Sequence, residues 1–437
     1  MYNFITNFYL ENQKELEVLK MKVKFITLGC KTNFYESQAL AEIFRQKGYT
    51  VVKSGKADVV VVNTCAVTSM GAQKSRQQIH KAKKDNPDAI VAVMGCYSQT
   101  DPDALKDSPD VDVMIGTSGR GRICELVEDA LKGKRRILQS DIMKERSFEE
   151  LAAASDQSRI RATVKIEDGC SNFCTYCIIP YARGPVRSRE IGKIVDEVKS
   201  LAQNGFSEVV LTGIHIGSYG KDLKSGLSLI DVVEAVCSVD GIKRVRLGSI
   251  EPVVITEDFV NRIKNLSNLC PQFHLSLQSG STKTLARMKR RYTAEEYMQA
   301  VRLLRENIKD TSITTDLMVG FPGETDEEFE ESYNFCKNIG FMQMHIFKYS
   351  KRPGTVAAEM ENQVPEQVKE LRSQKMLELE KQMKADFYNS YNGKTVDVLV
   401  EVRTKDGRFH ATTPNYMDVF VESDEDISGK IVSYTFK

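Results

Sequence analysis

Short apolar runs alternate with helical stretches six times between residues 161 and 391, and this alternation limits the folds open to the chain. A strand followed by a helix and a further strand packs as a parallel unit, so the repeats predict a partial (β/α)6 barrel of the TIM type. In such barrels, reactive groups lie in the loops after the C-terminal ends of the strands. The expected strands are Ala162–Ile166, Glu208–Leu211, Arg244–Leu247, Phe273–Leu277, Ile313–Met318 and Met342–Phe347.

Three cysteines follow the first of these strands at a Cys-x3-Cys-x2-Cys spacing: Cys170, Cys174 and Cys177. Thiolates are soft ligands suited to iron–sulfur clusters, and a four-iron cluster normally takes four of them. Because only three are local, one iron would stay open to a ligand from outside the protein, which is typical of a catalytic site. A zinc knuckle or a disulfide pair is the alternative, but no nearby Cys or His offers a fourth ligand.

A second set of cysteines lies in residues 22–132, where alternating strand and helix patterns predict a mostly parallel α/β domain. Cys30, Cys65 and Cys96 each come just past the end of an expected strand. Ligands of open α/β sheets bind at that edge, so the three thiolates could converge there. Three buried structural cysteines are the alternative, since free cysteine packs well. The expected strands are Val23–Leu28, Ala57–Val62, Ala89–Met94 and Val111–Ile115.

The bulk composition excludes several classes of protein. The 437 residues are 41% hydrophobic and 28% charged, which suits two or three globular domains. The net charge of +1 gives no global argument for a nucleic-acid partner. Residues 1–20 lack the pattern of a secretory signal, and the apolar runs are too short to span a bilayer. We expect a cytoplasmic protein with reduced thiols and no membrane association.

Polar and glycine residues follow the later barrel strands and could cradle a nucleoside cofactor. Thr212 and Gly213 follow the second strand, Ser249 follows the third and Gln278 follows the fourth. Glycine lets the backbone approach a ligand closely, although each of these loops alone could be an ordinary turn. His215 could lie in the same pocket or could simply be hydrogen-bonded within its loop.

Alternating apolar residues after Gly393 predict a small all-β unit, of the barrel type that binds single-stranded or looped RNA. From Lys384 onward there are seven Lys and Arg against nine Asp and Glu, so this unit is not basic. If RNA binds, basic groups of the barrel region are expected to contact its phosphates, with ordinary surface charge as the alternative. These groups are Arg183, Arg187 and Arg189; Lys289, Arg290 and Arg291; and Lys348, Lys351 and Arg352.

The predicted layout has five parts. They are an N-terminal extension (1–20), a parallel α/β domain (21–133), a linker (134–160), the barrel (161–391) and the all-β domain (392–437). The last stretch of the barrel region, residues 365–391, predicts a long charged helix that either bridges domains or packs on one of them.

With these motifs in place, the chain after Met21 resembles the radical S-adenosylmethionine (SAM) methylthiotransferase family. Its segments 28–33 (LGCKTN) and 174–184 (CTYCIIPYARG) are most similar to the threonylcarbamoyladenosine tRNA methylthiotransferases. The isopentenyladenosine-type enzymes typically have Cys-Gln-Met-Asn at the first site, and the branch that modifies a ribosomal-protein aspartate typically lacks Tyr-Ala-Arg after the second. Thr32 stands where the subfamily often has Val, which is a conservative departure. The C-terminal unit resembles a TRAM domain.

The resemblance implies two [4Fe-4S] clusters, SAM, and the anticodon stem-loop of a tRNA as substrate. The cluster on Cys170, Cys174 and Cys177 would bind SAM at its open iron and yield a 5′-deoxyadenosyl radical. The cluster on Cys30, Cys65 and Cys96 would hold the sulfur that is inserted at C2 of N6-threonylcarbamoyladenosine next to the anticodon, and a second SAM would supply the methyl group. A radical cofactor is needed because side-chain acids and bases cannot activate this aromatic C–H bond. The residues expected to contact SAM are Thr212, Gly213, Ser249, Gln278 and Arg290.

Other readings stay open at this point. The same chemistry could act on N6-isopentenyladenosine in tRNA or on a ribosomal-protein aspartate. A more distant alternative is a non-enzymatic iron–sulfur protein that binds RNA or senses redox state, although a sensor would not need six barrel loops around an open iron. A reductant such as flavodoxin or ferredoxin and a sulfur donor are the remaining expected partners.

Overall fold

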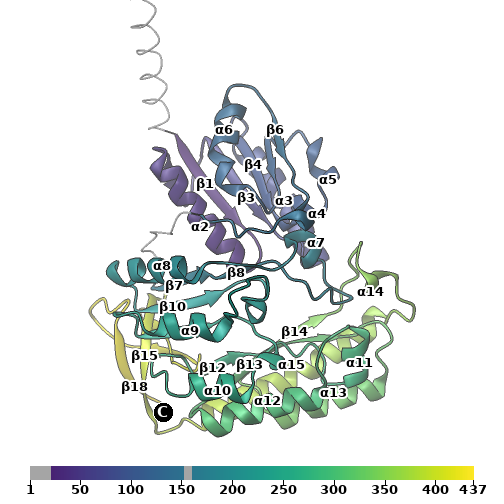
Figure 1. Ribbon diagram of the computed structural model, residues 1–437, viewed down its shortest axis with the longest axis vertical. Helices are drawn as coiled ribbons and strands as arrows, with labels where there is room; N and C mark the ends of the chain where they lie inside the picture. The colour runs from purple at the N-terminus through teal and green to yellow at the C-terminus, as the bar shows by residue number, and fades with distance from the viewer. Residues whose placement is uncertain (1–20, 152–159) are drawn as a thin grey trace, which may run out of the picture. The chain divides into compact units, whose positions relative to one another are not determined.

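A computed structural model describes residues 21–151 and 160–437, which form two compact units (Figure 1). The first unit holds the described residues of 21–151 together with 168–172 and 177–187. The second unit holds 160–167, 173–176 and 188–437. The predicted N-terminal extension and part of the predicted linker lie outside the described residues.

The first unit contains a six-stranded parallel sheet in the order β2-β1-β3-β4-β5-β6. Val59 and Val61 of one central strand pack on one face of the sheet, and Val60 and Val62 pack on the other. Both faces are therefore covered, which explains the unbroken apolar run in the sequence. The strands are β1 (Lys22–Thr27), β2 (Thr50–Val52), β3 (Val59–Thr64), β4 (Ile90–Gly95), β5 (Val113–Ile115) and β6 (Arg136–Leu138).

Helices cover both faces of this sheet. On one face lie α2 (Lys31–Gln46) and α6 (Ile123–Leu131), which share a hydrophobic core with the strands. The other face is covered by α3 (Ser69–Asp85), α4 (Cys96–Thr100), α5 (Asp103–Lys106) and α7 (Ile179–Arg183).

The linker predicted from residue 134 begins later than expected. Arg136–Leu138 pairs in parallel with β5 as the last strand of the sheet. Arg136 Nη2 lies 2.8 Å from Asp129 Oδ2, which anchors this short strand to the end of α6. Three residues between basic neighbours are too few to give a recognisable strand pattern.

The second unit confirms the predicted partial barrel. Its six strands are parallel and follow one another in chain order, with isolated parallel bridges such as Ile250 to Leu275 joining the two halves. The strands are β7 (Arg161–Lys165), β10 (Glu208–Thr212), β11 (Arg244–Leu247), β12 (Gln272–His274), β13 (Ser312–Val319) and β14 (Gln343–Lys348). Two-residue strands β8 (Glu167–Asp168) and β9 (Arg187–Ser188) flank the cysteine loop in the sequence. The helices are α8 (Ile191–Gln203), α9 (Leu229–Cys237), α10 (Glu257–Ile263), α11 (Thr282–Arg287), α12 (Ala294–Asn307), α13 (Asp326–Ile339), α14 (Val356–Glu359) and α15 (Glu366–Asn389).

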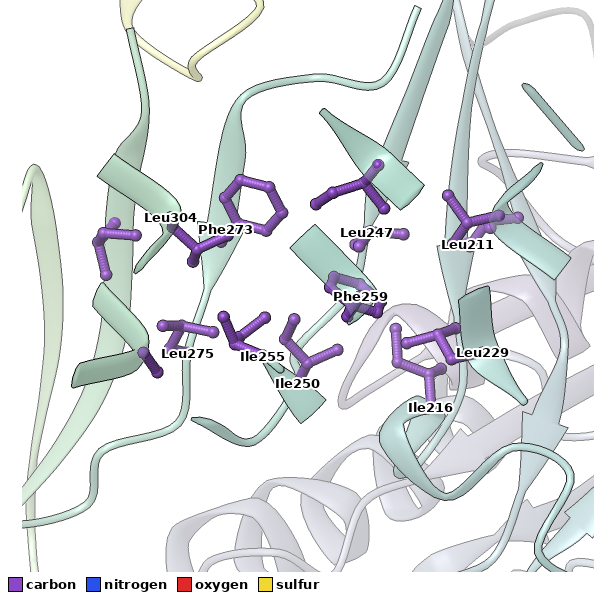
Figure 2. Close-up of a cluster of buried hydrophobic side chains, with 14 of the residues drawn as sticks. Leu211, Ile216, Leu229, Leu247, Ile250, Ile255, Phe259, Phe273, Leu275 and Leu304 are labelled. Atoms are coloured by element: carbon purple, nitrogen blue, oxygen red, sulfur yellow. The ribbon is translucent and has the colours of Figure 1, made fainter. Parts of the chain in front are cut away.

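A continuous hydrophobic core fills the space between the barrel strands and their helices (Figure 2). Phe273 and Leu275 contribute from the fourth strand and its extension, with Phe259 from α10 and Leu304 from α12. Burial of each such side chain contributes about 1.5–3 kcal/mol to folding. Because side chains alternate along a strand, His274 points to the opposite side, toward the barrel interior.

The long helix α15 both packs on the barrel and leads into the all-β unit. Met376, Leu379 and Met383 lie in the barrel core, whereas Phe387 and Tyr388 pack against the core of the C-terminal sheet. Neither this helix nor any other in the described ranges is both long and apolar enough to cross a membrane.

The C-terminal unit is all-β, as predicted, and its sheet is antiparallel in the order β17-β16-β15-β18. Val398, Val400, Phe409 and Ala411 form its buried centre. The strands are β15 (Thr395–Arg403), β16 (Phe409–Thr412), β17 (Asp418–Val421) and β18 (Ile431–Thr435).

This sheet docks onto the N-terminal ends of the barrel strands, away from the loops that follow their C-terminal ends. Arg244 donates to the carbonyl oxygens of Thr412 and Asp397 at 2.9 and 2.8 Å. Arg246 donates to the carbonyl oxygen of Pro414 at 2.9 Å. The two arginines satisfy carbonyl oxygens of β15, of β16 and of the loop after β16, so this contact is polar.

Glu208 is the buried carboxylate at this contact. Its Oε1 lies 2.5 Å from Arg161 Nε and 3.2 Å from Arg246 Nε. Burial alone would raise the pKa of Glu208, but Arg246, Arg161 and Arg244 hold it below its usual value. The carboxylate therefore stays charged and fixes the arginines that hold the C-terminal sheet.

Replacing Glu208 with alanine is expected to lower the free energy of unfolding of the second unit by about 3–5 kcal/mol, because it leaves buried guanidinium groups without a carboxylate. Urea denaturation monitored by circular dichroism measures this loss. Glu234→Ala, which removes a partly exposed partner of Arg262, should cost less than about 1 kcal/mol. Equal losses in the two variants would contradict the anchoring role of Glu208.

Candidate functional site

The cysteines at positions 30, 65 and 96 all follow strands at one edge of the parallel sheet. Cys30 is the N-cap of α2, three residues after β1; Cys65 directly follows β3; and Cys96 opens α4 directly after β4. The chain direction across the sheet reverses between β1 and β3, because β2 lies on the outer side of β1. Open α/β sheets bind ligands at such a switch point, so the fold places two of the cysteines there.

The three cysteine side chains come together at this edge. A Cβ atom on Gly29 would lie 3.2 Å from the Cβ of Cys65, so the first two loops are in contact. Burial raises the pKa of Cys96 to about 11, Arg183 opposes that rise, and the nearby thiols of Cys30 and Cys65 add to it. Burial therefore favours the protonated thiol of Cys96, and a bound metal would displace that proton.

Gly95 allows Cys96 to turn back toward the sheet edge. Its φ of +103° lies in the region that favours glycine. A Cβ there would lie 2.5 Å from Asn63 Oδ1 and 2.6 Å from the Thr64 carbonyl oxygen. Glycine is thus required at position 95 by backbone geometry.

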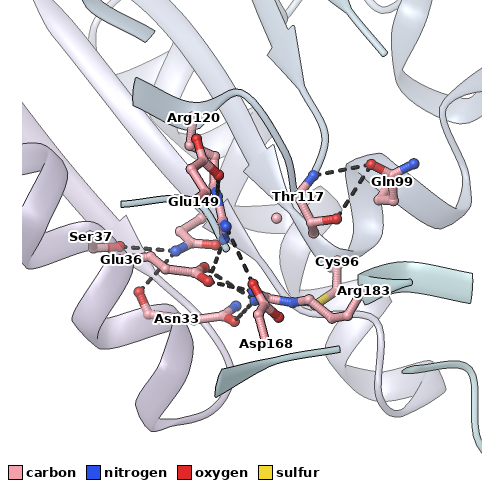
Figure 3. Close-up of polar contacts among 12 residues, drawn as sticks. Asn33, Glu36, Ser37, Cys96, Gln99, Thr117, Arg120, Glu149, Asp168 and Arg183 are labelled. Atoms are coloured by element: carbon pink, nitrogen blue, oxygen red, sulfur yellow. Dashed lines mark hydrogen bonds and ion pairs between the residues drawn. The ribbon is translucent and has the colours of Figure 1, made fainter. Parts of the chain in front are cut away.

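Cys96 lies against a buried polar network within the first unit (Figure 3). Arg183, at the end of α7, donates from Nε to Cys96 Sγ at 3.2 Å. Its Nη2 donates to Asn33 Oδ1 at 2.6 Å, and the same oxygen lies 3.8 Å from Cys30 Sγ. One arginine from the second cysteine motif therefore reaches the loops of two cysteines of the first set.

The second cysteine motif is shared between the two units. Cys170 and Cys177 belong to the first, where the Cys170 amide donates to the Gly184 carbonyl oxygen at 3.0 Å. Gly169, with φ +88°, precedes Cys170, and a Cβ there would lie 2.0 Å from the Pro185 carbonyl oxygen. The loop is therefore closed tightly against the end of α7 by backbone contacts that only glycine permits.

Cys174 belongs to the second unit, where it is buried. Arg290 Nη1 donates to Cys174 Sγ at 3.3 Å, and Arg290 Nη2 lies 2.7 Å from Glu251 Oε1. Thr175 fixes the adjacent backbone, since its amide donates to the Met288 carbonyl oxygen at 3.1 Å. Burial alone would lower the pKa of Arg290, but its neighbours, Glu251 among them, raise it well above the usual value, so the group remains a cation.

Two carboxylates, Glu167 and Glu251, join four loops at the rim of the barrel. The sequence patterns did not identify either of them as a site residue. Glu251 pairs with His215 Nε2 at 3.0 Å as well as with Arg290. Glu167 Oε2 accepts from the His215 amide at 2.8 Å and would lie 2.6 Å from a Cβ on Gly213. His215 is thus a hydrogen-bonded loop residue. Glu251 stands two residues after Ser249, so its position after a strand was the available signal.

The five predicted SAM contacts lie in different surroundings. Thr212 is buried at the end of β10, and Arg290 is engaged with Cys174 and Glu251. Ser249 Oγ lies 2.7 Å from Ser276 Oγ, so the segment that follows β11 contacts the segment that follows β12. Gln278 has φ +68°, and its amide donates to the Asp316 carbonyl oxygen at 2.9 Å.

The barrel interior near these loops carries polar side chains that the sequence patterns did not reveal. His274 Nε2 lies 3.3 Å from Asp316 Oδ2, and the rings of His274 and His345 stack with centroids 5.9 Å apart. His274 lies in β12, Asp316 in β13 and His345 in β14, which are the last three strands of the barrel. An alternation of polar and apolar residues in three short strands was the only available signal.

Three thiols in each set suit the thiolate ligation of an iron–sulfur cluster. Among residues 21–151 and 160–437, no three His, Cys, Asp or Glu side chains are close enough to hold one ion. The cysteines of a cluster bind separate irons, so they need a wider arrangement. Cys96 and Cys174 each accept an N–H from a buried arginine, and such donors stabilise thiolate sulfur in clusters.

A parallel six-stranded half-barrel with a three-cysteine loop after its first strand defines the class of radical SAM enzymes. The model of the Radical SAM superfamily matches residues 164–336, and that of uncharacterized protein family UPF0004 matches residues 22–116. The radical SAM methyltransferase TsrM from Kitasatospora setae, solved with cobalamin and a [4Fe-4S] cluster, matches with a TM-score of 0.58 at 15% identity. That likeness covers 78% of this chain and 74% of the other, and concerns the fold.

Two curated relatives indicate which family of radical SAM enzymes the chain belongs to. The chain is 40% identical to threonylcarbamoyladenosine tRNA methylthiotransferase MtaB of Bacillus subtilis, over 94% of this chain and 92% of the relative. It is 35% identical to tRNA-2-methylthio-N(6)-dimethylallyladenosine synthase of Acetivibrio thermocellus, over 97% of this chain and 90% of the relative. The chain belongs to the radical SAM methylthiotransferase family.

Proposed function

We propose that this protein inserts a methylthio group at C2 of N6-threonylcarbamoyladenosine, next to the anticodon of tRNA. The observation that carries the proposal is the 40% identity to a threonylcarbamoyladenosine tRNA methylthiotransferase over nearly the whole of both chains. The identity to a dimethylallyladenosine enzyme is 35%. The two cysteine motifs that distinguish the subfamilies in the sequence support the same choice.

The six cysteines divide into two proposed cluster sites. Cys170, Cys174 and Cys177 would hold the [4Fe-4S] cluster that, when bound, supplies reductive cleavage of SAM. Cys30, Cys65 and Cys96 would hold the cluster that carries the sulfur for insertion. The protein's own part is to fix the thiols, and it does so with strand-end loops, tight glycine turns and arginine donors.

Five residues are proposed to contact SAM: Thr212, Gly213, Ser249, Gln278 and Arg290. Ser249 and Gln278 are accessible on the rim and can donate to a polar cofactor. Arg290 is held between Glu251 and Cys174. Its guanidinium would therefore bind the carboxylate of SAM from a position that is already fixed.

The tRNA is proposed to be held at more than one place. Among the basic groups of the barrel region, Lys289 and Arg291 are exposed and remain candidates for phosphate contacts. Arg183, Arg187 and Arg189 are buried and paired with carboxylates, so the expectation that they contact phosphates is wrong. The C-terminal sheet, proposed to be a TRAM domain, would grip part of the tRNA distant from the reacting adenine, because it docks at the other end of the barrel strands.

The remaining assignments follow from the same function. The domain limits proposed are 161–391 for the barrel and 392–437 for the TRAM domain, while the N-terminal domain, predicted as 21–133, is extended to residue 138 because β6 belongs to its sheet. A low-potential reductant such as flavodoxin or ferredoxin and a sulfur donor complete the partners. The cytoplasm is the proposed location, because tRNA is modified there.

Mass spectrometry of tRNA nucleosides from a deletion strain tests the substrate. Methylthio-threonylcarbamoyladenosine should disappear and return when the gene is restored. If it persists while the methylthio form of isopentenyladenosine is lost from the tRNA, or that of an aspartate is lost from peptides of the ribosomal proteins, the proposed substrate is wrong. Failure of the reduced, reconstituted protein to form 5′-deoxyadenosine from SAM would leave only a binding or sensing role.

A further inference from the structure

The short helix α7 connects the two cysteine motifs within the first unit. It begins at Ile179, two residues after Cys177, and ends at Arg183, which contacts Cys96. At 1.5 Å per residue, the five residues of α7 span about 7.5 Å. Ile178 and Ala182 are buried in the same hydrophobic core as Cys96, so the helix is held along its length.

Arg183 is fully buried, and each of its nitrogen atoms has a partner (Figure 3). Its Nε donates to Cys96 Sγ, its Nη2 donates to Asn33 and to Glu36 Oε2, and its Nη1 pairs with Glu36 and lies 3.4 Å from Asp168 Oδ2. A guanidinium is a rigid planar fork. The Nη contacts therefore fix the plane in which Nε points at the sulfur.

Asn33 extends this contact to the other two cysteine loops. Its Nδ2 donates to the Leu28 carbonyl oxygen at 2.8 Å, before Cys30, and to the Thr64 carbonyl oxygen at 3.0 Å, before Cys65. Its Oδ1 accepts from Arg183. Arg183 is thus hydrogen-bonded, directly or through one amide, to the backbone or sulfur of all three cysteine loops.

A second buried arginine shares the carboxylates but does not touch sulfur in this network. Arg120 pairs with Glu36, with Glu149 at 2.8 Å and with Asp168 at 3.3 Å. Burial alone would lower the pKa of Arg120, but these carboxylates raise it. Arg120 therefore has the burial and the charge of Arg183 without its contact to Cys96, which makes it a matched control.

We propose that Arg183 is a positioning residue for the cluster on Cys30, Cys65 and Cys96: it locks the three loops to α7, and its N–H to Cys96 sulfur raises the reduction potential of that cluster. A donor to ligand sulfur stabilises the more negative, reduced state of a cluster. The inference rests on the proposed function, because it requires that these three cysteines hold a cluster.

The test uses the full chain with Cys170, Cys174 and Cys177 replaced by alanine, so that one cluster site remains. Arg183→Gln, Arg183→Lys and Arg120→Lys are made in this background and reconstituted without oxygen. Iron content gives the occupancy, and electron paramagnetic resonance during a redox titration gives the potential.

In Arg183→Gln the ratio of reduced to oxidised cluster at a fixed potential should fall at least tenfold, which is a shift of at least about 59 mV for a one-electron couple. Arg183→Lys keeps the charge and should recover part of the shift, while Arg120→Lys should keep the parent potential. Loss of iron in both Arg183 variants, but not in Arg120→Lys, also supports the positioning role.

Two results overturn the inference. Parent-like potentials in both Arg183 variants at full iron occupancy would show that Arg183 does not act on the cluster, and the same loss of iron in all three variants would show a merely structural network. Absence of iron from the parent background would instead refute the N-terminal cluster itself, so failure of the proposed function is recognised separately.

Discussion

Replacing Cys177 with alanine is expected to lower the rate of SAM cleavage by at least about 1,000-fold, which corresponds to about 4 kcal/mol of activation free energy. The physical reason is the ligand count. A motif with three local thiolates has none to spare, since the remaining iron is needed for SAM. Iron at Cys30, Cys65 and Cys96 should be retained, because their loops are held by the sheet edge and not by the Cys177 side chain. Chromatographic measurement of 5′-deoxyadenosine, together with iron analysis, checks both parts.

The control for this variant is Cys237→Ala. Cys237 ends α9 and is partly buried among the helices of the barrel, where burial raises the pKa of its thiol to about 12. It should keep the iron content and SAM cleavage of the parent protein. If Cys177→Ala cleaves SAM at a rate near that of this control, Cys177 is not a ligand of the proposed cluster.

Replacing Cys65 with alanine is expected to separate SAM cleavage from sulfur insertion. Formation of 5′-deoxyadenosine should continue, while the methylthio product falls by about 100-fold or more, equivalent to at least about 3 kcal/mol of activation free energy. Cys65 stands at the switch point of the sheet, and the hydroxyl of Ser75 accepts from its amide and donates to its carbonyl. The backbone of the loop should therefore keep its conformation without the thiol. The expected loss of methylthio product then reflects the missing cluster ligand and not a distorted loop.

Product analysis on a threonylcarbamoyladenosine-containing anticodon stem-loop measures this separation. Iron content should fall by about half while the spectrum of the remaining cluster is unchanged. Equal loss of SAM cleavage and of sulfur insertion in both the Cys65 and Cys177 variants would contradict the division of labour between the two cysteine sets.

Most long elements could be predicted from sequence, because their apolar periodicity is set by which face is buried. The helices α12 and α13 show the local signals of a helix start, since Thr293 and Thr325 each form a capping box at the N-terminus. The strands β2, β6 and β16 were missed, because a strand of three or four residues carries too little pattern, even where it is paired on both sides, as β16 is. The five-residue helix α7 was missed for the same reason, although it carries Arg183.

The charged residues show where sequence reasoning failed. A run containing Arg183, Arg187 and Arg189 beside a catalytic loop predicts a basic surface for phosphates. The fold buries all three and pairs them with carboxylates, and the Glu36 that pairs with Arg183 lies 147 positions away in the sequence. A charge pattern cannot reveal burial, because burial depends on partners that only folding supplies.

By itself, the sequence determined the alternation of strands and helices, the spacing of three local thiols and the position of three more thiols at strand ends. These are properties of neighbouring residues, and neighbours fix periodicity and turn chemistry. The tertiary structure decided the strand order that places Cys30 and Cys65 on the two sides of a switch point. It also decided the contact of Arg183 with Cys96, across 87 positions of the chain. That contact depends on how an entire sheet packs with a later helix, and no local pattern contains it.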